Sequence, residues 1–241
     1  MKYFKEYLDY KIIKNMKKYD FKSPVLEAGC GTGETLELVS KYYDIKGIDL
    51  SEEAISICKK KEVNAQRANI VDVKEKFNSI ISIDVVEHIE DDLTAVKHFY
   101  KSLNKDGKLF ILVPSGRMMK DDIGYGHYRR YSKDAIKSLL EECNFRIEFV
   151  EMFGFPVLYY ARILMNYLYK LKGRDEGILE EGLLDENTLR SSYEHPYDNT
   201  IFGRILETLP ITRLLSKLLL FQNMFASGNK GFAVIVVASK S

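Results

Sequence analysis

Short apolar runs alternate with helical segments between residues 24 and 153, and this alternation restricts the possible folds more than any other feature of the chain. Residues 108–114 (KLFILVP) have the length and composition of a buried strand. Residues 51–61 (SEEAISICKKK) have an acidic first turn behind Ser51, which can cap a helix. A repeated order of strand and helix predicts an α/β fold with a parallel, doubly wound sheet and helices on both faces. The predicted strands are residues 24–29, 44–50, 63–70, 78–86, 108–114 and 145–153, and the predicted helices are residues 33–43, 51–61, 92–103 and 132–144.

The chain continues on both sides of this alternating region. Residues 2–19 are predicted to form an amphipathic helix. After residue 153, two apolar segments with helical character enclose an acidic stretch, and the continuous apolar run near the end is typical of a buried strand that returns to the sheet. We therefore expect a single domain over residues 1–241, with an N-terminal helix in 1–23, a cofactor-binding core over 24–153, a helical insertion or lid over 154–230 and a last strand over 231–239.

Composition excludes several classes of protein. A net charge of +1 argues against nonspecific binding to nucleic acid. Three widely spaced cysteines argue against a disulfide framework and favour a reducing cytoplasm. We expect no signal peptide at the N-terminus, and no apolar run reaches the roughly 18 to 20 residues that cross a bilayer. The chain is therefore expected to act in the cytoplasm as a monomer or a homodimer.

Three glycines follow the first predicted strand within residues 25–34 (VLEAGCGTGE). Glycine is needed where the chain turns tightly and a ligand approaches the backbone closely. The spacing is G-x-G-x-G, which differs from the G-x-G-x-x-G of dinucleotide-binding loops. No basic residue accompanies the loop, and Glu27 precedes it. A cationic ligand therefore suits this loop better than a pyrophosphate does.

Polar residues also follow the next three predicted strands. Asp49 ends the second strand, where a carboxylate can accept hydrogen bonds from both hydroxyls of a ribose. Asn69 and Ile70 follow the third strand and could read and cover a purine, and Asp84 follows the fourth. Because the carboxyl ends of parallel strands share one edge of a sheet, these residues are expected to line one site.

These four motifs, in this order, resemble the class I S-adenosylmethionine-dependent methyltransferases. The resemblance covers residues 24–153 and the last strand, and it implies a Rossmann-like, seven-stranded sheet whose last strand is antiparallel. It also implies S-adenosylmethionine as the cofactor, held through its methionine part by the glycine loop and through its ribose by Asp49. The cofactor-binding residues predicted in this way are Glu27, Gly29, Cys30, Gly31, Gly33, Asp49, Leu50, Asn69, Ile70 and Asp84.

Two alternatives to a methyltransferase stay open. A glycine-rich turn followed by an acidic residue also occurs in NAD-dependent oxidoreductases. A noncatalytic scaffold protein could keep the cofactor fold without turning over a substrate. Cys30 inside the loop could in principle be a nucleophile, although a small residue that fits a tight turn is the simpler interpretation.

Residues 124–134 (GYGHYRRYSKD) follow the fifth predicted strand, so this loop should open above the methyl donor. His127, Arg129, Arg130 and Tyr131 could then face the acceptor, and two guanidinium groups would suit a phosphate or carboxylate on it. Alternatively, the arginines pair with acidic residues such as Asp121 and Asp122 and hold the loop. The stretch resembles a subgroup of these methyltransferases related to ubiquinone-pathway and polysaccharide-cluster enzymes.

Three side chains at the end of the fourth strand, Asp84, Glu87 and His88, have the i, i+3, i+4 spacing of one helical turn. They could bind a divalent metal that orients a catechol-like acceptor, or Glu87 and His88 could make local hydrogen bonds. We favour the second interpretation and predict no metal. The predicted catalytic residues are His127, Arg130 and His88.

The acceptor is expected to be a small molecule with an oxygen nucleophile that is anionic or linked to a lipid or isoprenoid. This expectation follows from the resemblance more than from individual residues. The insertion at residues 154–230 could be a lid, a dimer interface or a peripheral membrane contact, because both of its helical segments are strongly apolar.

Overall fold

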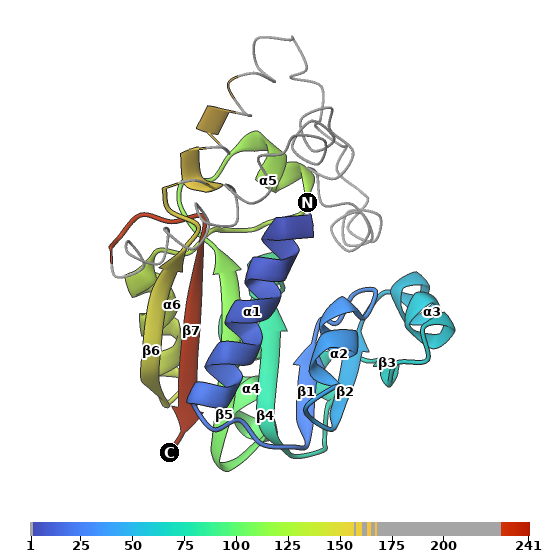
Figure 1. Cartoon of the computed structure of the whole chain (residues 1–241). Coiled ribbons are helices and arrows are strands. Elements are labelled where there is room, and N and C mark those ends of the chain that lie inside the picture. The colour runs from blue at the N-terminus through green and yellow to red at the C-terminus, as the bar shows by residue number, and fades with distance from the viewer. Residues whose placement is uncertain (1, 157, 161–162, 165–166, 168–227) are drawn as a thin grey trace.

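A computed structural model describes residues 2–156, 158–160, 163–164, 167 and 228–241, and Figure 1 draws the rest as a thin grey trace. The strands are β1 (Val25–Ala28), β2 (Ile45–Asp49), β3 (Ala65–Arg67), β4 (Phe77–Ile83), β5 (Leu103–Pro114), β6 (Phe145–Phe153) and β7 (Ala233–Lys240). The helices are α1 (Lys2–Lys18), α2 (Glu34–Val39), α3 (Glu52–Lys60), α4 (Asp92–Ser102), α5 (Lys120–Gly124) and α6 (Lys133–Glu142), with short 3-10 helices η1 (Ile70–Asp72) and η2 (Val86–His88).

The strands form one seven-stranded sheet in the order β3-β2-β1-β4-β5-β7-β6. β1 pairs in parallel with β2 and β4, and β3 and β5 extend the parallel part on either side. β7 lies between β5 and β6 and is antiparallel to both. The predicted doubly wound α/β fold, with its antiparallel last strand, is therefore confirmed.

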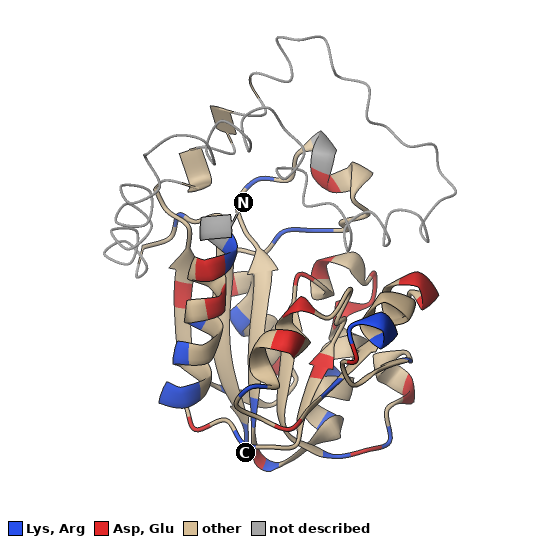
Figure 2. Ribbon diagram, turned by 45° about the vertical axis from the view of Figure 1, so that its right-hand side comes forward, with Lys and Arg blue, Asp and Glu red and all other residues tan. Residues whose placement is uncertain are grey.

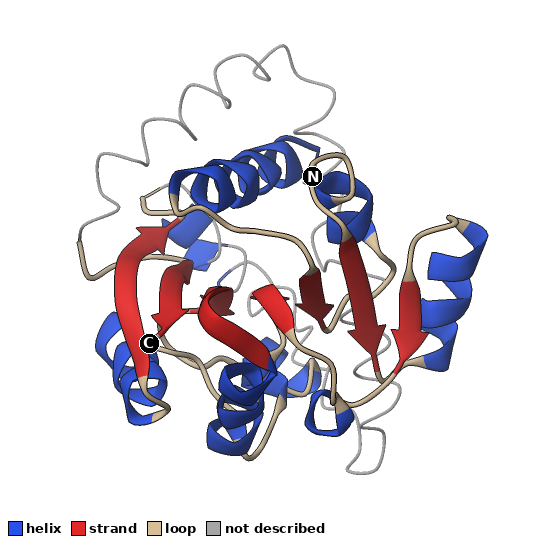
Figure 3. Cartoon of the chain, turned by 90° about the horizontal axis from the view of Figure 1, so that it is seen from below, coloured by secondary structure: helices blue, strands red, loops and turns tan. Residues whose placement is uncertain are grey.

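Helices cover both faces of the sheet (Figure 3). α1, α2 and α3 pack on one face around residues such as Val25 and Ile81, whereas α4 and α6 pack on the other around residues such as Leu26 and Ile80. Neighbouring residues along a strand point to opposite faces, so a strand that is covered on both sides is apolar throughout. This burial on two faces explains why β4 and β5 were recognisable as continuous apolar runs.

Two predicted helix starts are confirmed at the level of single hydrogen bonds. The Ser51 hydroxyl accepts from the backbone N–H of Ala54, and the Ser132 hydroxyl accepts from that of Ala135, each over 3.1 Å. Each bond satisfies one of the amide donors that the first turn of a helix leaves without an intrahelical partner. α3 and α6 therefore begin where their sequences predict.

The largest differences from the predicted elements occur at strand and helix ends. β3 is shorter than the predicted strand 63–70, so Asn69 and Ile70 lie beyond it. α2 ends at Val39 instead of residue 43. β5 begins at Leu103 instead of residue 108, but residues 104–107 bulge from the ladder, since Phe77 faces Leu103 and Ser79 already faces Lys108. α5 was not predicted.

Charged residues of both signs are intermixed over the described elements (Figure 2). On α1, Figure 2 shows acidic residues nearer the N-terminal end and lysines in the C-terminal half. Lys17 and Lys18 occupy the last turn, where the helix dipole favours positive charge.

Most of the predicted insertion lies outside the described residues. Residues 158–160, 163–164 and 167 are helical, as expected for its first segment. The two ends of the insertion meet, because the N–H of Phe232 donates to the carbonyl of Phe153 over 2.7 Å. Among the described residues, no helix is long and apolar enough to span a membrane. The lid, dimer-interface and membrane-contact hypotheses for 154–230 stay predictions.

Candidate active site at the carboxyl edge of the sheet

The glycine loop leaves β1 with left-handed backbone angles. The φ angles of Gly29, Gly31 and Gly33 are 76°, 50° and 82°, a region that side chains with a Cβ rarely adopt. A Cβ on Gly29 would lie 2.3 Å from Cγ2 of Val85, which follows β4. The loop therefore passes against the end of β4, and at Gly29 it requires glycine for both conformation and space.

Asp49 ties this loop to the start of α3. Its Oδ2 accepts from the Gly31 N–H over 2.8 Å, and its Oδ1 accepts from the Ser51 N–H over 2.9 Å. Each carboxylate oxygen has a second lone pair, so these bonds leave room for hydrogen bonds from ribose hydroxyls. Its position at the carboxyl end of β2, beside the glycine loop, agrees with the predicted role in binding ribose.

Glu27 is buried in β1 directly below the loop. Burial is the main cause that raises the pKa of its carboxyl group to about 8, and the nearby Asp49 carboxylate raises it further. A hydrogen bond from Thr35 opposes this shift in part. A bound cation would favour the ionised form, so the site is prepared for a ligand with positive charge.

The Cys30 thiol is also buried, beside the Cys58 thiol. Burial raises its pKa, and the Glu27 carboxylate adds to the shift. A thiol that is not readily ionised is a poor nucleophile. The geometry therefore supports the interpretation that Cys30 is a small residue that fits the turn.

The residues predicted to meet the adenine base differ in exposure. Leu50 is exposed, Asn69 is half-buried, and Ile70 belongs to the core on the α4 face of the sheet. The Asn69 side-chain oxygen accepts from the Val71 N–H over 3.2 Å and so caps η1. The N–H of Ala68 donates to the carbonyl of Asp49, which brings this segment beside the expected ribose position.

Asp84 follows β4 with a φ angle of 50°, and its side chain is exposed at the edge of the sheet. Its N–H donates to the carbonyl of Leu112, which continues the ladder between β4 and β5 by one bond. Asp84 therefore lies where the chain turns away from the sheet into η2.

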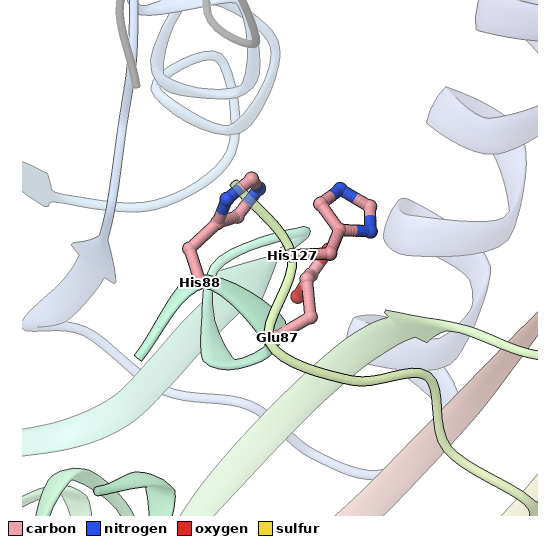
Figure 4. Close-up of side chains that lie close together, drawn as sticks. All are labelled: Glu87, His88 and His127. Carbon is pink, nitrogen blue, oxygen red and sulfur yellow. The ribbon is translucent and has the colours of Figure 1, made fainter. Parts of the chain in front are cut away.

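Glu87, His88 and His127 converge from two segments of the chain (Figure 4). One possible ligand atom from each lies within 4.8 Å of the other two. The imidazole rings of His88 and His127 meet edge to face with centroids 4.5 Å apart. The sequence pattern had instead grouped Glu87 and His88 with Asp84, which is not a member of this cluster.

Burial shifts the pKa of two side chains in the cluster, Glu87 and His88. Burial raises the pKa of Glu87 well above its ordinary value, and the Asp84 carboxylate adds to the shift. Burial lowers the pKa of His88, against a smaller opposite effect of its hydrogen bond with the Gly126 backbone. The His88 imidazole is therefore neutral at neutral pH, which leaves one ring nitrogen with a free lone pair.

The loop that carries His127 is fixed to the end of β4. The N–H of Tyr128 donates to the carbonyl of Glu87 over 2.8 Å, and the N–H of His127 donates to the carbonyl of Asp122 over 2.9 Å. The loop therefore holds His127 beside η2 through backbone bonds that do not depend on the identity of its side chains.

The geometry does not support the prediction that Arg130 contacts the acceptor. Its side chain is only 4% exposed, and Nη1 lies 2.5 Å from Oδ1 of Asp122. The same guanidinium donates to the carbonyls of Ser115 and Phe232. This is the bracing alternative, with Asp122 as the partner, and it joins the loop to α5 and to the chain that enters β7.

Arg129 and Tyr131 are also engaged within the fold. Arg129 pairs with Asp92 over 2.5 Å and donates to the carbonyl of Glu90. Tyr131 is buried, and its hydroxyl donates to Asp92 over 2.7 Å. Of the four residues predicted to face the acceptor, His127 therefore lies beside His88. Arg129 and Tyr131 instead hold the loop against α4 through Asp92.

Asp122 was named in the sequence only as a possible partner of the arginines, and its burial beside His127 was not predicted. Its side chain is 4% exposed, accepts from the Met119 N–H and Arg130, and lies 3.7 Å from Nδ1 of His127. A short, irregular helix without apolar periodicity surrounds it, so no local pattern marked it as buried. The signal in the sequence was its place as an acidic residue close to Arg129 and Arg130.

The fold is α/β, and the residues predicted to contact a ribose-containing, positively charged cofactor lie at or near the carboxyl edge of its sheet. The chain matches the family model described as "Methyltransferase domain" over residues 4–149, which is more than half of its length. The chain belongs to this family. S-adenosylmethionine is accordingly its cofactor, and the prediction of this cofactor is confirmed.

Individual relatives agree with this assignment. The chain is 29% identical over 119 residues to a ubiquinone biosynthesis O-methyltransferase of Pelagibacter ubique, a match that covers 44% of this chain and 50% of the relative. It is 27% identical over 106 residues to the enzyme of the same name from Haemophilus ducreyi, covering 38% of this chain and 45% of the relative. The chain thus spans about half the length of the curated relatives it matches.

The solved structures support the fold. The chain resembles an S-adenosylmethionine-dependent methyltransferase from Archaeoglobus fulgidus with a TM-score of 0.54 and 16% sequence identity, covering 96% of this chain and 94% of that one. At this identity, the likeness concerns the arrangement of strands and helices and not the substrate.

Proposed function

We propose that the protein transfers the methyl group of S-adenosylmethionine to an oxygen atom of a small-molecule acceptor. One observation carries this proposal: the glycine loop and the Glu87–His88–His127 cluster adjoin each other at the carboxyl edge. Val85 contacts Gly29, and Glu87 and His88 lie on the turn that follows. A donor held by the loop would have the cluster on its acceptor side.

Methyl transfer from S-adenosylmethionine requires mainly that the protein align the reacting atoms. The sulfonium already activates the methyl group, so transfer depends mainly on placing nucleophile, methyl carbon and sulfur in line. The glycine loop and Asp49 would fix the donor, and the loop at 124–131 would fix the acceptor. A hydroxyl acceptor must also lose its proton during transfer.

Oxygen is favoured as the accepting atom for two reasons. Two imidazoles and a carboxyl group meet at the cluster, and these are groups that can receive a proton or help its removal. The relatives from Pelagibacter ubique and Haemophilus ducreyi are named O-methyltransferases.

The acceptor's remaining chemistry is better described as apolar than as anionic. Arg129 and Arg130, the residues that suggested an anion, already pair with Asp92 and Asp122. Beyond β6, four described apolar side chains are exposed where the insertion begins: Tyr160, Ile163, Leu164 and Tyr167. We propose that these side chains face an apolar, lipid-like part of the acceptor.

The cellular setting is part of the same proposal. All three cysteines are buried and free, which suits a reducing cytoplasm. A small-molecule acceptor and a single domain require no nucleic-acid partner, and either a monomer or a homodimer would suffice.

Methyl transfer from radiolabelled S-adenosylmethionine tests the proposal directly. The acceptor panel should contain catechols and phenols with and without an isoprenoid tail, with carboxylic acids and amines for comparison. Turnover is expected on hydroxyl acceptors with an apolar tail. His127→Ala should lower kcat/KM by about 100-fold or more while leaving S-adenosylhomocysteine affinity unchanged. His98→Ala, a histidine of α4 outside the cluster, is the matched control.

The same experiment distinguishes the remaining alternative. Tight binding of S-adenosylhomocysteine by calorimetry, without turnover on any acceptor of the panel, would indicate a noncatalytic scaffold. Preferential turnover of amines would show that the accepting atom is nitrogen. The family assignment already decides against the NAD-dependent oxidoreductase.

A further inference from the structure

We propose that Glu87, His88 and His127 together bind one divalent first-row transition metal ion, such as Zn²⁺. The three residues come from two segments, η2 and the loop before α6, and their ligand atoms lie within 4.8 Å of one another. Ions of this type bind imidazole nitrogen and carboxylate oxygen at about 2.0 to 2.2 Å, so neighbouring ligand atoms lie roughly 3 to 4 Å apart. A small inward movement of side chains would close the site.

Glu87 provides the first argument. Glu87 is fully buried, and among the described residues no other residue donates a hydrogen bond to either of its carboxyl oxygens. A buried carboxyl group without a partner is costly to the fold and rare in native proteins. Its neighbours are the two imidazoles, and Figure 4 shows the three side chains grouped together. A cation between them would satisfy the carboxylate.

The surroundings of the imidazoles provide the second argument. One ring nitrogen of His88 is hydrogen-bonded to the Gly126 backbone, which orients the ring, so its other nitrogen can act as a ligand. For His127, Oδ1 of Asp122 lies 3.7 Å from Nδ1. This distance is too long for a hydrogen bond, so the ring would have to move slightly to gain the carboxylate partner that orients many metal-binding histidines.

The donor set indicates the class of ion. Two imidazoles and one carboxylate suit Zn²⁺, Mn²⁺, Fe²⁺ or Ni²⁺, whereas Mg²⁺ prefers an octahedral set of oxygens. Three protein ligands leave at least one coordination position open. If the proposed methyl transfer to oxygen is correct, the acceptor oxygen could occupy that position, where a metal ion would favour loss of its proton.

This site differs from the one that sequence spacing suggested. Asp84 is exposed and lies outside the cluster, and its place is taken by His127, almost forty residues later. Binding would therefore depend on the loop at 124–131. That loop is held at the cluster by the bond from Tyr128 to Glu87 and by the Asp122–Arg130 pair.

The experiment measures metal binding alone, without acceptor or methyl donor. The full-length protein is treated with EDTA, dialysed, and titrated with Zn²⁺ by calorimetry, with Co²⁺ by visible absorption and with Mg²⁺ for comparison. We expect one Zn²⁺ per chain, a Co²⁺ spectrum typical of nitrogen ligands, and much weaker binding of Mg²⁺. His127→Gln and Glu87→Gln should each weaken Zn²⁺ binding by about 100-fold or more, since ligands matter at least as much as their outer partners.

His98→Gln is the matched control and should bind Zn²⁺ as the unmodified protein does. His127→Gln keeps the proposal testable if Glu87→Gln fails to fold. Absence of a one-to-one Zn²⁺ complex, or Zn²⁺ affinity unchanged in His127→Gln, would overturn the site. S-adenosylhomocysteine affinity is measured on the same samples and reports separately on the proposed methyltransferase function. Failure of the metal site would therefore not decide whether the protein is a methyltransferase.

Discussion

Three acidic residues at the carboxyl edge differ in burial, and burial decides what each can do. Glu27 is enclosed below the glycine loop, Asp49 is buried but holds two backbone amides, and Asp84 is exposed. The pKa of Glu27 is raised to about 8 because few groups compensate its charge. A cationic cofactor would thus change the ionisation of Glu27 more than that of an exposed carboxylate.

Replacing Asp49 by Asn should weaken binding of S-adenosylhomocysteine. The substitution removes the charge from hydrogen bonds to ribose and to the Gly31 amide, and a charged hydrogen bond contributes about 1.5 to 3 kcal/mol. Affinity is expected to fall about 10- to 100-fold, measured by isothermal titration calorimetry. Asp72→Asn, at an exposed position in η1, should have no effect. Equal affinity of Asp49→Asn and the unmodified protein would contradict the assigned role.

Glu27 predicts a dependence of stability on pH. Its pKa in the folded protein, about 8, lies above the ordinary value of 4.5, so the folded state holds a proton that the unfolded state loses in this range. This contribution is complete below about pH 4.5 and is lost as the pH rises through about 8. Compared with Glu27→Gln, the free protein should lose a free energy of unfolding on the order of a few kcal/mol between pH 5 and pH 8.

Urea denaturation of both proteins across this pH range measures the difference. Cofactor binding should release a proton near pH 7, because the positive charge of S-adenosylmethionine favours the Glu27 carboxylate. Calorimetry in buffers with different ionisation enthalpies detects that proton. Parallel pH profiles for the unmodified protein and Glu27→Gln would show that Glu27 is ionised in the free state.

At the scale of elements, one buried ion pair fixes the loop between β5 and α6. Arg130 contacts Asp122, the carbonyl of Ser115 and the carbonyl of Phe232. These partners belong to the end of β5, to α5 and to the chain entering β7. The position of His127 therefore depends on three separate parts of the sequence.

Arg130→Ala should destabilise the protein without weakening the cofactor complex. Removing one member of a buried pair leaves the Asp122 charge uncompensated and typically costs about 3 to 5 kcal/mol. The free energy of unfolding is measured by urea denaturation, and S-adenosylhomocysteine affinity should stay within about twofold. Arg117→Ala, at an exposed position, should change stability by less than about 0.5 kcal/mol. A loss confined to turnover, with stability intact, would instead return Arg130 to the acceptor site.

Local patterns in the sequence predicted the strands and caps but not this loop. β6 has the predicted bounds because apolar residues recur at nearly every second position between Phe145 and Phe153, and Ser51 and Ser132 act within their own turns. The contact of Glu87 with His127 and the pair of Arg130 with Asp122 join segments without periodicity. Such contacts depend on how the loop folds over the edge of the sheet, which neighbouring residues do not encode.

The cofactor half of the site was predictable for the opposite reason. Gly29, Gly31 and Asp49 lie at fixed offsets from the ends of two adjacent parallel strands, so their order along the chain determines their proximity. The acceptor half has no such rule. This is why the cofactor followed from the sequence, whereas the acceptor is still a proposal.

At the scale of the whole molecule, a second buried ion pair joins the N-terminal helix α1 to β6, the strand at one edge of the sheet. The Lys11 ammonium lies 2.9 Å from both carboxyl oxygens of Glu151 in β6, and both side chains are less than a tenth exposed. Nearby, the rings of Tyr7 and Phe153 stack with centroids 5.1 Å apart. α1 is therefore part of the packed core and crosses the face of the sheet (Figure 1).

Lys11→Met should cost about 3 to 5 kcal/mol of unfolding free energy, because the Glu151 charge is left buried alone. The double variant Lys11→Met with Glu151→Leu should recover most of this loss, since two apolar side chains replace two charges of similar volume. Urea denaturation measures both, with the exposed Lys14→Ala as a neutral control. If the single and double variants are equally destabilised, the ion pair is not the cause.

β7 enters the sheet between β5 and β6, and Phe232 bonds to Phe153 where β6 ends. The segment between these two residues therefore leaves and rejoins the domain at a single point. Its length and composition can change without altering the register of any strand, since closing a longer loop costs little. If this segment shapes the acceptor site as proposed, natural variation or laboratory grafting at this junction would change the acceptor while the methyl-donor half is inherited unchanged.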